Sequence, residues 1–156
     1  MKPKQRHLML EQLEATLEPL ASLRTVRRPV RGWLRAIRDA VGMSGRQFAV
    51  RLGVSSEWIS KLEKNELHGT VTLKTMQRAA EALDCEFVYA IVPRDSLSGM
   101  VRHRAEQVAR QRMAGVAHTM LLEGQQLEAT EQHKALAREI EELIREIPRE
   151  LWDAPE

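Results

Sequence analysis

Side chains that donate and accept hydrogen bonds share one face of a short helix predicted to begin after Ser55. Because Val54, Ile59 and Leu62 recur at helical spacing, they take the buried face of that helix. The residues left outward are Ser56, Glu57, Trp58, Ser60 and Lys61. Serine bonds to several base edges, glutamate accepts from the amino group of cytosine, and lysine reaches guanine or phosphate. The outward face therefore has the chemistry to read base pairs in a DNA major groove.

A second short helix must precede this one and hold it in place. Its apolar residues Phe48, Ala49 and Leu52 follow helical spacing, and Gly53 then permits a sharp turn. Ser44 stands one residue before the first helix, as Ser55 does before the second, and both positions suit an N-cap hydroxyl. The arrangement predicts a helix-turn-helix, whose second helix enters the major groove.

The predicted DNA contacts extend beyond the outward face of the second helix. Arg46 and Gln47, near the start of the first helix, are candidates for the sugar–phosphate backbone, which fixes register without reading sequence. Trp58 offers apolar area for a thymine methyl group, or it packs beside an earlier helix. The full predicted set is Arg46, Gln47, Ser55, Ser56, Glu57, Trp58, Ser60, Lys61 and Lys64.

The segment FAVRLGVSSEWISKLEKNE resembles the core of the repressor-like (Xre-family) helix-turn-helix proteins. With GWLRAIRDAVGMSGRQ before it, TVTLKTMQRAAEALDCEFVYAIVPR after it, and the later AHTMLLEGQ and ELIREIPRELWD, the chain resembles the mobile mystery protein A family. Members of that family usually lie in mobile elements beside a gene for a Fic-domain protein. Repressor-like domains also commonly link their first helix to the recognition helix by an ion pair, which here implies Arg38 with Glu63.

A second motif is read from the same resemblance. Thr119, Glu123 and Gly124 match (S/T)xxxE(G/N), the inhibitory motif of antitoxins that silence Fic-domain nucleotidyltransferases. In those antitoxins the glutamate pairs with an active-site arginine that otherwise holds the ATP γ-phosphate, so ATP cannot bind productively. Thr119 and Glu123 share a helix face at i and i+4, and glycine is also a common helix terminator. The alternative is therefore a helix-turn-helix regulator of a mobile element with no inhibitory role.

Charge is segregated along the chain although its formal net value is only +2. The segment from Arg24 to Arg51 contains eight arginines and a single acid, Asp39. Residues 123–156 contain ten acids and four bases. This separation suggests that the basic segment contacts phosphate and that the acidic segment contacts a different kind of partner. Within the basic segment, RTVRRP is a connector that touches phosphate, enters a minor groove, or is merely solvated.

The flanking segments are predicted from apolar spacing. Helices are expected over 8–23, with a break at Pro19, and over about 33–41, 72–83, 96–125 and 130–146. Among the residues expected inward are Trp33, Leu34, Ile37, Val41, Leu73, Met76, Ala79, Ala80, Leu83 and Trp152. Residues 86–92 favour a strand, which needs a partner, and a second copy of the chain would supply one. The alternative for 86–92 is a buried helical segment.

These patterns predict a mainly α fold: a repressor-like helix-turn-helix domain with a single dimerising β-strand and a C-terminal helical extension. The expected divisions are an arm and connector at 1–28, the DNA-binding domain at 29–93, and the helical region at 94–156. No HExxH spacing, CxxC pair or glycine-rich phosphate loop occurs, so we expect no catalysis, metal or cofactor. The single Cys85 and the lack of a signal peptide or long apolar run favour a cytoplasmic protein without a membrane segment. Expected partners are operator DNA, a Fic-domain toxin and a second copy.

Overall fold

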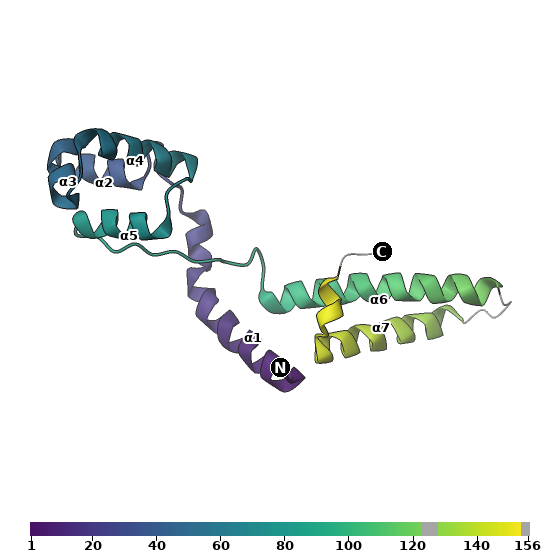
Figure 1. The fold of residues 1–156 in the computed structure, drawn as a ribbon. Coiled ribbons are helices and arrows are strands. Elements are labelled where there is room, and N and C mark those ends of the chain that lie inside the picture. Colours follow the sequence, from purple (N-terminus) through teal and green to yellow (C-terminus); the bar gives the residue numbers. More distant parts are fainter. Residues whose placement is uncertain (123–127, 154–156) are drawn as a thin grey trace. The chain divides into compact units, whose positions relative to one another are not determined.

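The chain forms two compact units in a computed structural model that describes residues 1–122 and 128–153 (Figure 1). One unit is Ser22–Ile91, and the other combines Met1–Ala21 with Val92–Glu156. The regular structure of the described residues is helical throughout. None of the described helices is both long enough and apolar enough to cross a membrane.

The Ser22–Ile91 unit wraps four helices around one core. They are α2 (Trp33–Ala40), α3 (Gly45–Leu52), α4 (Ser56–His68) and α5 (Leu73–Ala82), and all four are seen in Figure 1. The buried core residues are Leu34, Phe48, Ala49, Ile59, Leu62, Ala79 and Leu83. Since each helix contributes only one or two of these, none of the four could bury enough apolar surface alone.

Side-chain caps and one glycine set the helix boundaries that position α3 and α4. The hydroxyl oxygens of Ser44, Ser55 and Thr72 each accept a hydrogen bond from the backbone N–H three residues later, at 3.2 Å in every case. Gly53 ends α3 with φ +73°, in the left-handed region that glycine enters without steric cost. The predicted caps and the predicted helix-turn-helix turn are therefore confirmed.

Three apolar residues of this unit are exposed although their spacing predicted a buried position. Trp33 and Leu73 are the first residues of α2 and α5, and Val41 is the C-cap of α2. Residues at the ends of such short helices project past the core, so periodicity alone overstates their burial. The inward predictions for Leu34, Met76, Ala79, Ala80 and Leu83 hold, because these side chains are buried or packed against the core.

The predicted dimerising strand at residues 86–92 is wrong, and so is its alternative, a buried helical segment. No β-strand occurs in the described part of the chain, and this segment has no regular structure. Val88 is 67% exposed and Ile91 is 89% exposed, while the rings of Phe87 and Tyr89 stack with centroids 6.0 Å apart. A preference for strand is realised only where a neighbouring strand supplies hydrogen bonds, and none of the described segments does so. The expected homodimer was inferred from this strand and loses that basis.

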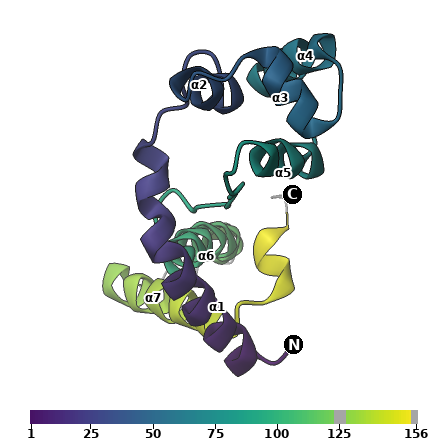
Figure 2. The same cartoon turned by 90° about the vertical axis from the view of Figure 1, so that its left-hand side faces the viewer.

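The second unit is built on a helical hairpin. Helices α6 (Leu97–Leu122) and α7 (Ala129–Glu146) lie side by side in both Figure 1 and Figure 2, and the 3-10 helix η2 (Arg149–Trp152) follows α7. The core of this unit is Val101, Ala105, Val108, Ala109, Leu143, Ile147 and Leu151. Helix α1 (Pro3–Leu17) packs its Leu10 against the same core.

Two features of this unit concern its helix ends. Helix α1 gives way at Glu18 to the 3-10 helix η1 (Glu18–Thr25), so the break predicted at Pro19 is confirmed. At the other end, Ile147 adopts φ +41° and terminates α7 before Pro148. Leu151 then enters the core at 0% exposure, whereas Trp152, predicted to cover the apolar stripe, is 52% exposed. The shorter side chain takes the place expected for the larger one.

Candidate nucleic-acid interface

The outward face of α4 carries the polar side chains that the sequence predicts for base reading. Ile59 and Leu62 point into the core, and this orientation leaves the opposite side of the helix free. The residues Ser56, Glu57, Trp58, Ser60, Lys61 and Lys64 are all exposed there. Trp58 is 38% exposed, so its indole is partly open to solvent and partly packed against the protein.

Ser55 organises the N-terminal turn of α4. Its hydroxyl oxygen accepts the N–H of Trp58 at 3.2 Å, so this predicted DNA-binding residue already caps the helix. The pKa of the nearby Glu57 carboxyl is lowered, first by a hydrogen bond from its own backbone N–H and then by one from the Ser55 hydroxyl. Glu57 therefore stays ionised at neutral pH and acts only as an acceptor. Such a group suits a base amino group and repels phosphate.

Arg46 and Gln47 lie in the first turn of α3, and both side chains are exposed. The Gln47 side-chain oxygen Oε1 accepts from the Ser44 backbone N–H at 2.8 Å and from its hydroxyl at 2.9 Å. This capping box uses the oxygen of the amide and leaves its nitrogen as the donor toward an anion. Arg46 borders a shallow depression of about 530 Å³ that Val41 and Val50 also line.

An ion pair fixes α4 against α2. Arg38 Nε donates to Glu63 Oε1 at 2.9 Å, and its Nη1 donates to the Met43 carbonyl oxygen at 2.8 Å. The two charged side chains are only 11% and 9% exposed. This hydrogen bond with Glu63 is the main reason that the pKa of the Arg38 guanidinium is raised. The Arg38–Glu63 pair expected from the family resemblance is therefore present.

A second carboxylate of α4, which sequence reasoning missed, holds the start of α2. Glu66 is buried, and its oxygens accept the backbone N–H groups of Trp33 at 2.6 Å and Leu34 at 3.1 Å. A Cβ on Gly32 would lie 2.7 Å from Glu66 Oε2, so a larger residue there would force the capping carboxylate to shift. The helical spacing of the residues could have revealed this role. Glu66 lies on the same face of α4 as the buried Ile59 and Leu62, and a buried carboxylate needs hydrogen-bond donors.

Of the predicted toxin-inhibiting residues, Thr119 alone lies in the described part of the chain. It occupies the last turn of α6, and its hydroxyl donates to the Gly115 carbonyl oxygen at 3.1 Å. Glu123 and Gly124 lie outside the described residues. The structure therefore places one member of this motif on a helix.

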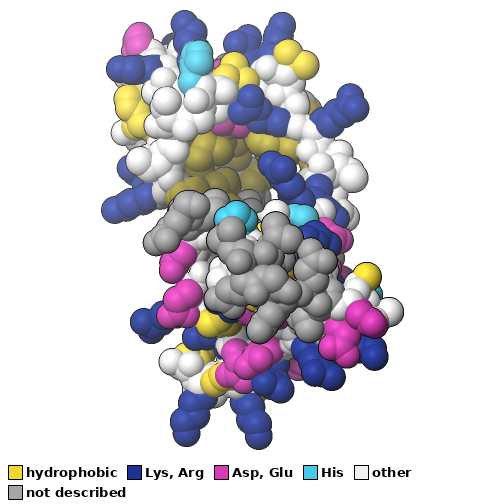
Figure 3. All heavy atoms as spheres, turned by 90° about the vertical axis from the view of Figure 1, so that its right-hand side faces the viewer, with side chains coloured by type: hydrophobic (Ala, Val, Ile, Leu, Met, Phe, Trp, Pro, Cys, Tyr) yellow, Lys and Arg dark blue, Asp and Glu magenta, His cyan; other side chains and the backbone are white. Residues whose placement is uncertain are grey.

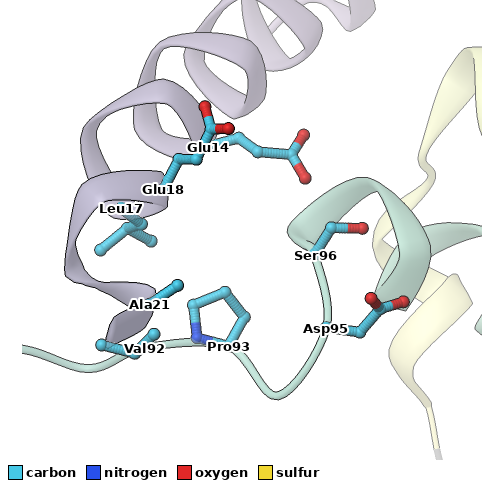
Figure 4. Close-up of a pocket in the computed structure, with 8 residues that line it drawn as sticks. All are labelled: Glu14, Leu17, Glu18, Ala21, Val92, Pro93, Asp95 and Ser96. Carbon is cyan, nitrogen blue, oxygen red and sulfur yellow. The ribbon is translucent and has the colours of Figure 1, made fainter. Parts of the chain in front are cut away.

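A cavity of about 340 Å³ lies in the second unit, beside the end of α1 and the segment before α6 (Figure 4). Glu14 on its rim accepts from the Ser98 hydroxyl at 3.0 Å, and Ser96 Oγ accepts the Gly99 N–H at 2.9 Å. These polar groups cap the start of α6 and attach α1 to it. Two of the polar groups at the cavity, on Glu14 and Ser96, are thus engaged in structural contacts.

Charge marks the Ser22–Ile91 unit as the basic part of the molecule. On the face seen in Figure 3, this unit shows many dark-blue Lys and Arg side chains and few acidic ones. Three of its acids are already engaged: Glu63 pairs with Arg38, Asp39 pairs with Arg38 and Arg35, and Asp84 pairs with Arg51. Such a surface attracts a polyanion.

Comparison with known families identifies this unit. Residues 34–89 match the family model described as Helix-turn-helix. That stretch begins in α2, includes α3, α4 and α5, and ends in the irregular segment after them. A search of curated proteins and a search of solved structures each returned no match. The chain therefore carries a helix-turn-helix domain of the type found in DNA-binding regulators.

Proposed function

We propose that this protein is a transcriptional regulator that binds double-stranded operator DNA through its helix-turn-helix domain, with α4 in the major groove. The observation that carries the proposal is the exposed polar face of α4, whose opposite side is joined to α2 by the Arg38–Glu63 pair and by Glu66. A reading helix must keep its side chains within a fraction of an ångström of base edges, and buried charged contacts behind it serve that need.

The exposed residues divide into readers and backbone contacts. Ser56, Ser60 and Lys61 offer donors to base edges, and Glu57 offers an acceptor for a cytosine amino group. Arg46 and Gln47 stand at the N-terminal turn of α3, where helix N–H groups and a cation favour phosphate. Lys64, one turn beyond Lys61, adds a further cation on the same helix.

The role of Lys61 is tested by enriching duplexes from a random pool with the whole protein and measuring affinity for the best one. Lys61→Ala should weaken binding about 10-fold or more, because one base or charge-assisted contact is worth ~1–3 kcal/mol. The matched control is Lys134→Ala, which removes an exposed lysine from α7 and should leave affinity unchanged. Equal affinities for the two variants would remove Lys61 from the interface.

We further propose, as the finer form of this function, that the regulator is the antitoxin of a Fic-type protein and represses its own operon. The proposal is supported by the Thr119, Glu123 and Gly124 pattern, by the place of Thr119 in the last turn of α6, and by the resemblance to the mobile mystery protein A family. Glu123 would compete for the arginine that binds the γ-phosphate of ATP.

The inhibitory role is tested by inspecting the adjacent reading frame for a Fic-domain protein and co-expressing that protein with this chain. Wild-type chain and Lys61→Ala should both protect growth, whereas Glu123→Gly should fail to protect while still binding DNA. If Glu123→Gly protects as well as wild type, the protein is a regulator without inhibitory activity.

A further inference from the structure

The basic connector, defined as residues 26–32, is fixed to the C-terminal end of α4. Arg28 reaches two carbonyl oxygens of the last turn of α4: its Nη1 donates to Glu66 at 3.3 Å and its Nη2 donates to Leu67 at 3.3 Å. The Glu66 carbonyl also accepts the Gly69 N–H at 3.1 Å, and a cation at this end of the helix meets the negative end of the helix dipole. Arg28 is therefore used as an anchor.

The other end of the basic connector is held by the same turn of α4. The Gly32 N–H donates to the Pro29 carbonyl oxygen at 3.0 Å and closes a turn, and the next two N–H groups bind the Glu66 carboxylate. Anchored at both ends, this segment is part of the domain surface rather than a free arm.

Two other arginines of the basic connector do not anchor it to the protein as Arg28 does. Arg27 and Arg31 are exposed, and neither has a hydrogen bond or an ion pair within the described part of the chain. The two buried carboxylates of α4 are already engaged, since Glu66 binds backbone N–H groups and Glu63 binds Arg38. The connector therefore presents two uncompensated positive charges next to the end of the predicted reading helix.

We propose that the basic connector is a second DNA-contacting element, in which Arg27 and Arg31 bind phosphates of the sugar–phosphate backbone beside the C-terminal end of α4. This inference rests on the proposed function of the helix-turn-helix domain. A phosphate contact fits better than insertion into a minor groove, because Arg28 and the turn closed by Gly32 keep the segment folded against the protein. Such contacts set register and affinity without reading sequence.

The salt dependence of binding tests the proposal with the whole protein and the duplex enriched from the random pool. Each phosphate contact contributes about −0.9 to the slope of log K against log salt concentration. The double variant Arg27→Ala/Arg31→Ala should therefore flatten the slope by about 1.8 and enrich the same motif from random DNA. The matched control, Arg138→Ala/Arg149→Ala, removes two exposed arginines from α7 and η2 and should keep the wild-type slope.

Three results would overturn the proposal, and only one of them would also contradict the DNA-binding function of the helix-turn-helix domain. A wild-type slope in Arg27→Ala/Arg31→Ala shows that the connector does not touch phosphate, while α4 can still read DNA. A changed motif shows that the connector reads bases instead. If the wild-type protein binds no duplex, the DNA-binding function and this inference fail together. An unchanged thermal unfolding midpoint in the double variant excludes misfolding as the cause of a flatter slope.

Discussion

Glu63 and Glu66 lie one turn apart on the buried side of α4, and each satisfies a different part of α2. Glu63 binds the guanidinium of Arg38, whereas Glu66 binds the free backbone N–H groups at the helix start. Two acids on one buried face carry a desolvation cost that only such partners offset. Together they hold α4 against the start of α2 through Glu66 and against its last turn through Glu63.

Removing Arg38 should leave Glu63 as a buried charge without its cation. We expect Arg38→Ala to lower the free energy of unfolding of the Ser22–Ile91 unit by about 3–5 kcal/mol. The double variant Arg38→Met/Glu63→Leu should recover most of that loss, because it removes both charges and fills their volume. Urea unfolding followed by Trp33 and Trp58 fluorescence measures both variants. If the two variants are equally destabilised, the cost arises from lost packing rather than from an unpaired carboxylate.

At the scale of single residues, the sequence and the family resemblance predict the pair Arg38–Glu63 but not the cap by Glu66. The pair joins two residue types of opposite charge at positions that repressor-like domains commonly link. The Glu66 contact goes to backbone N–H groups, which every residue has, so no residue type marks its partner. The exposed face of α4 was predictable because Ile59 and Leu62 define the opposite side.

At the scale of the helices, Gly32 and Gly53 show that a position can require glycine for its backbone conformation alone or for lack of space as well. Gly32 and Gly53 have nearly equal φ values, +81° and +73°. A Cβ on Gly32 would meet the Glu66 carboxylate, whereas a Cβ on Gly53 would meet no atom within 4 Å. Both positions therefore favour glycine because of their positive φ, and at Gly32 a side chain would also clash with the Glu66 carboxylate.

Alanine substitutions at Gly32 and Gly53 should separate the energetic cost of the backbone conformation from the cost of the steric clash. Gly53→Ala should cost about 1–2 kcal/mol of stability, the usual penalty for an alanine in the left-handed region. Gly32→Ala should cost at least ~1 kcal/mol more, because the Cβ displaces the carboxylate that caps α2. Thermal unfolding of both variants under identical conditions measures the difference. Equal losses would show that Glu66 moves aside freely and that the cap adds little.

At this scale the sequence predicts where helices begin better than it predicts how deeply their terminal residues are buried. The caps at Ser44, Ser55 and Thr72 were predictable because their side chains serve local N–H groups. The exposure of Trp33 and Leu73 was not, since a residue at the first position of a short helix follows the periodicity without reaching the core. The strand at 86–92 failed for a related reason: propensity cannot supply a neighbouring strand.

Across the whole molecule, the chain folds into two units with separate cores. The unit that holds α6 and α7 also recruits α1, whose Arg6 donates to the Ile147 carbonyl oxygen. His7 Nε2 lies 2.9 Å from the Arg145 carbonyl oxygen, so two neighbouring side chains serve the end of α7. Composition and spacing did not predict that residues 1–21 join residues 92–156, because these contacts pair side chains with backbone across about the whole length of the chain.

Leu151 and Trp152 test this second core with two adjacent residues. Leu151→Ala should destabilise the α6–α7 unit by about 2–5 kcal/mol, because a fully buried leucine leaves a cavity. Trp152→Ala should cost less than about 1 kcal/mol, since half of that side chain is already exposed. Hydrogen exchange reports each unit separately, and in both variants the amides of α3 and α4 should keep their protection. A larger loss for Trp152→Ala would reverse the assignment of the core residue.

The most direct test of the central claim is base preference after changes on the α4 face. The full-length wild type, Glu57→Gln and Lys61→Ala are each used to enrich duplexes from the same random pool, and the motifs are compared position by position. If α4 reads base edges as proposed, the wild type should enrich a motif, and each variant should lose preference at one or two positions while keeping the rest. Failure of the wild type to enrich a motif, or the same motif with the same preferences from all three proteins, would contradict the account.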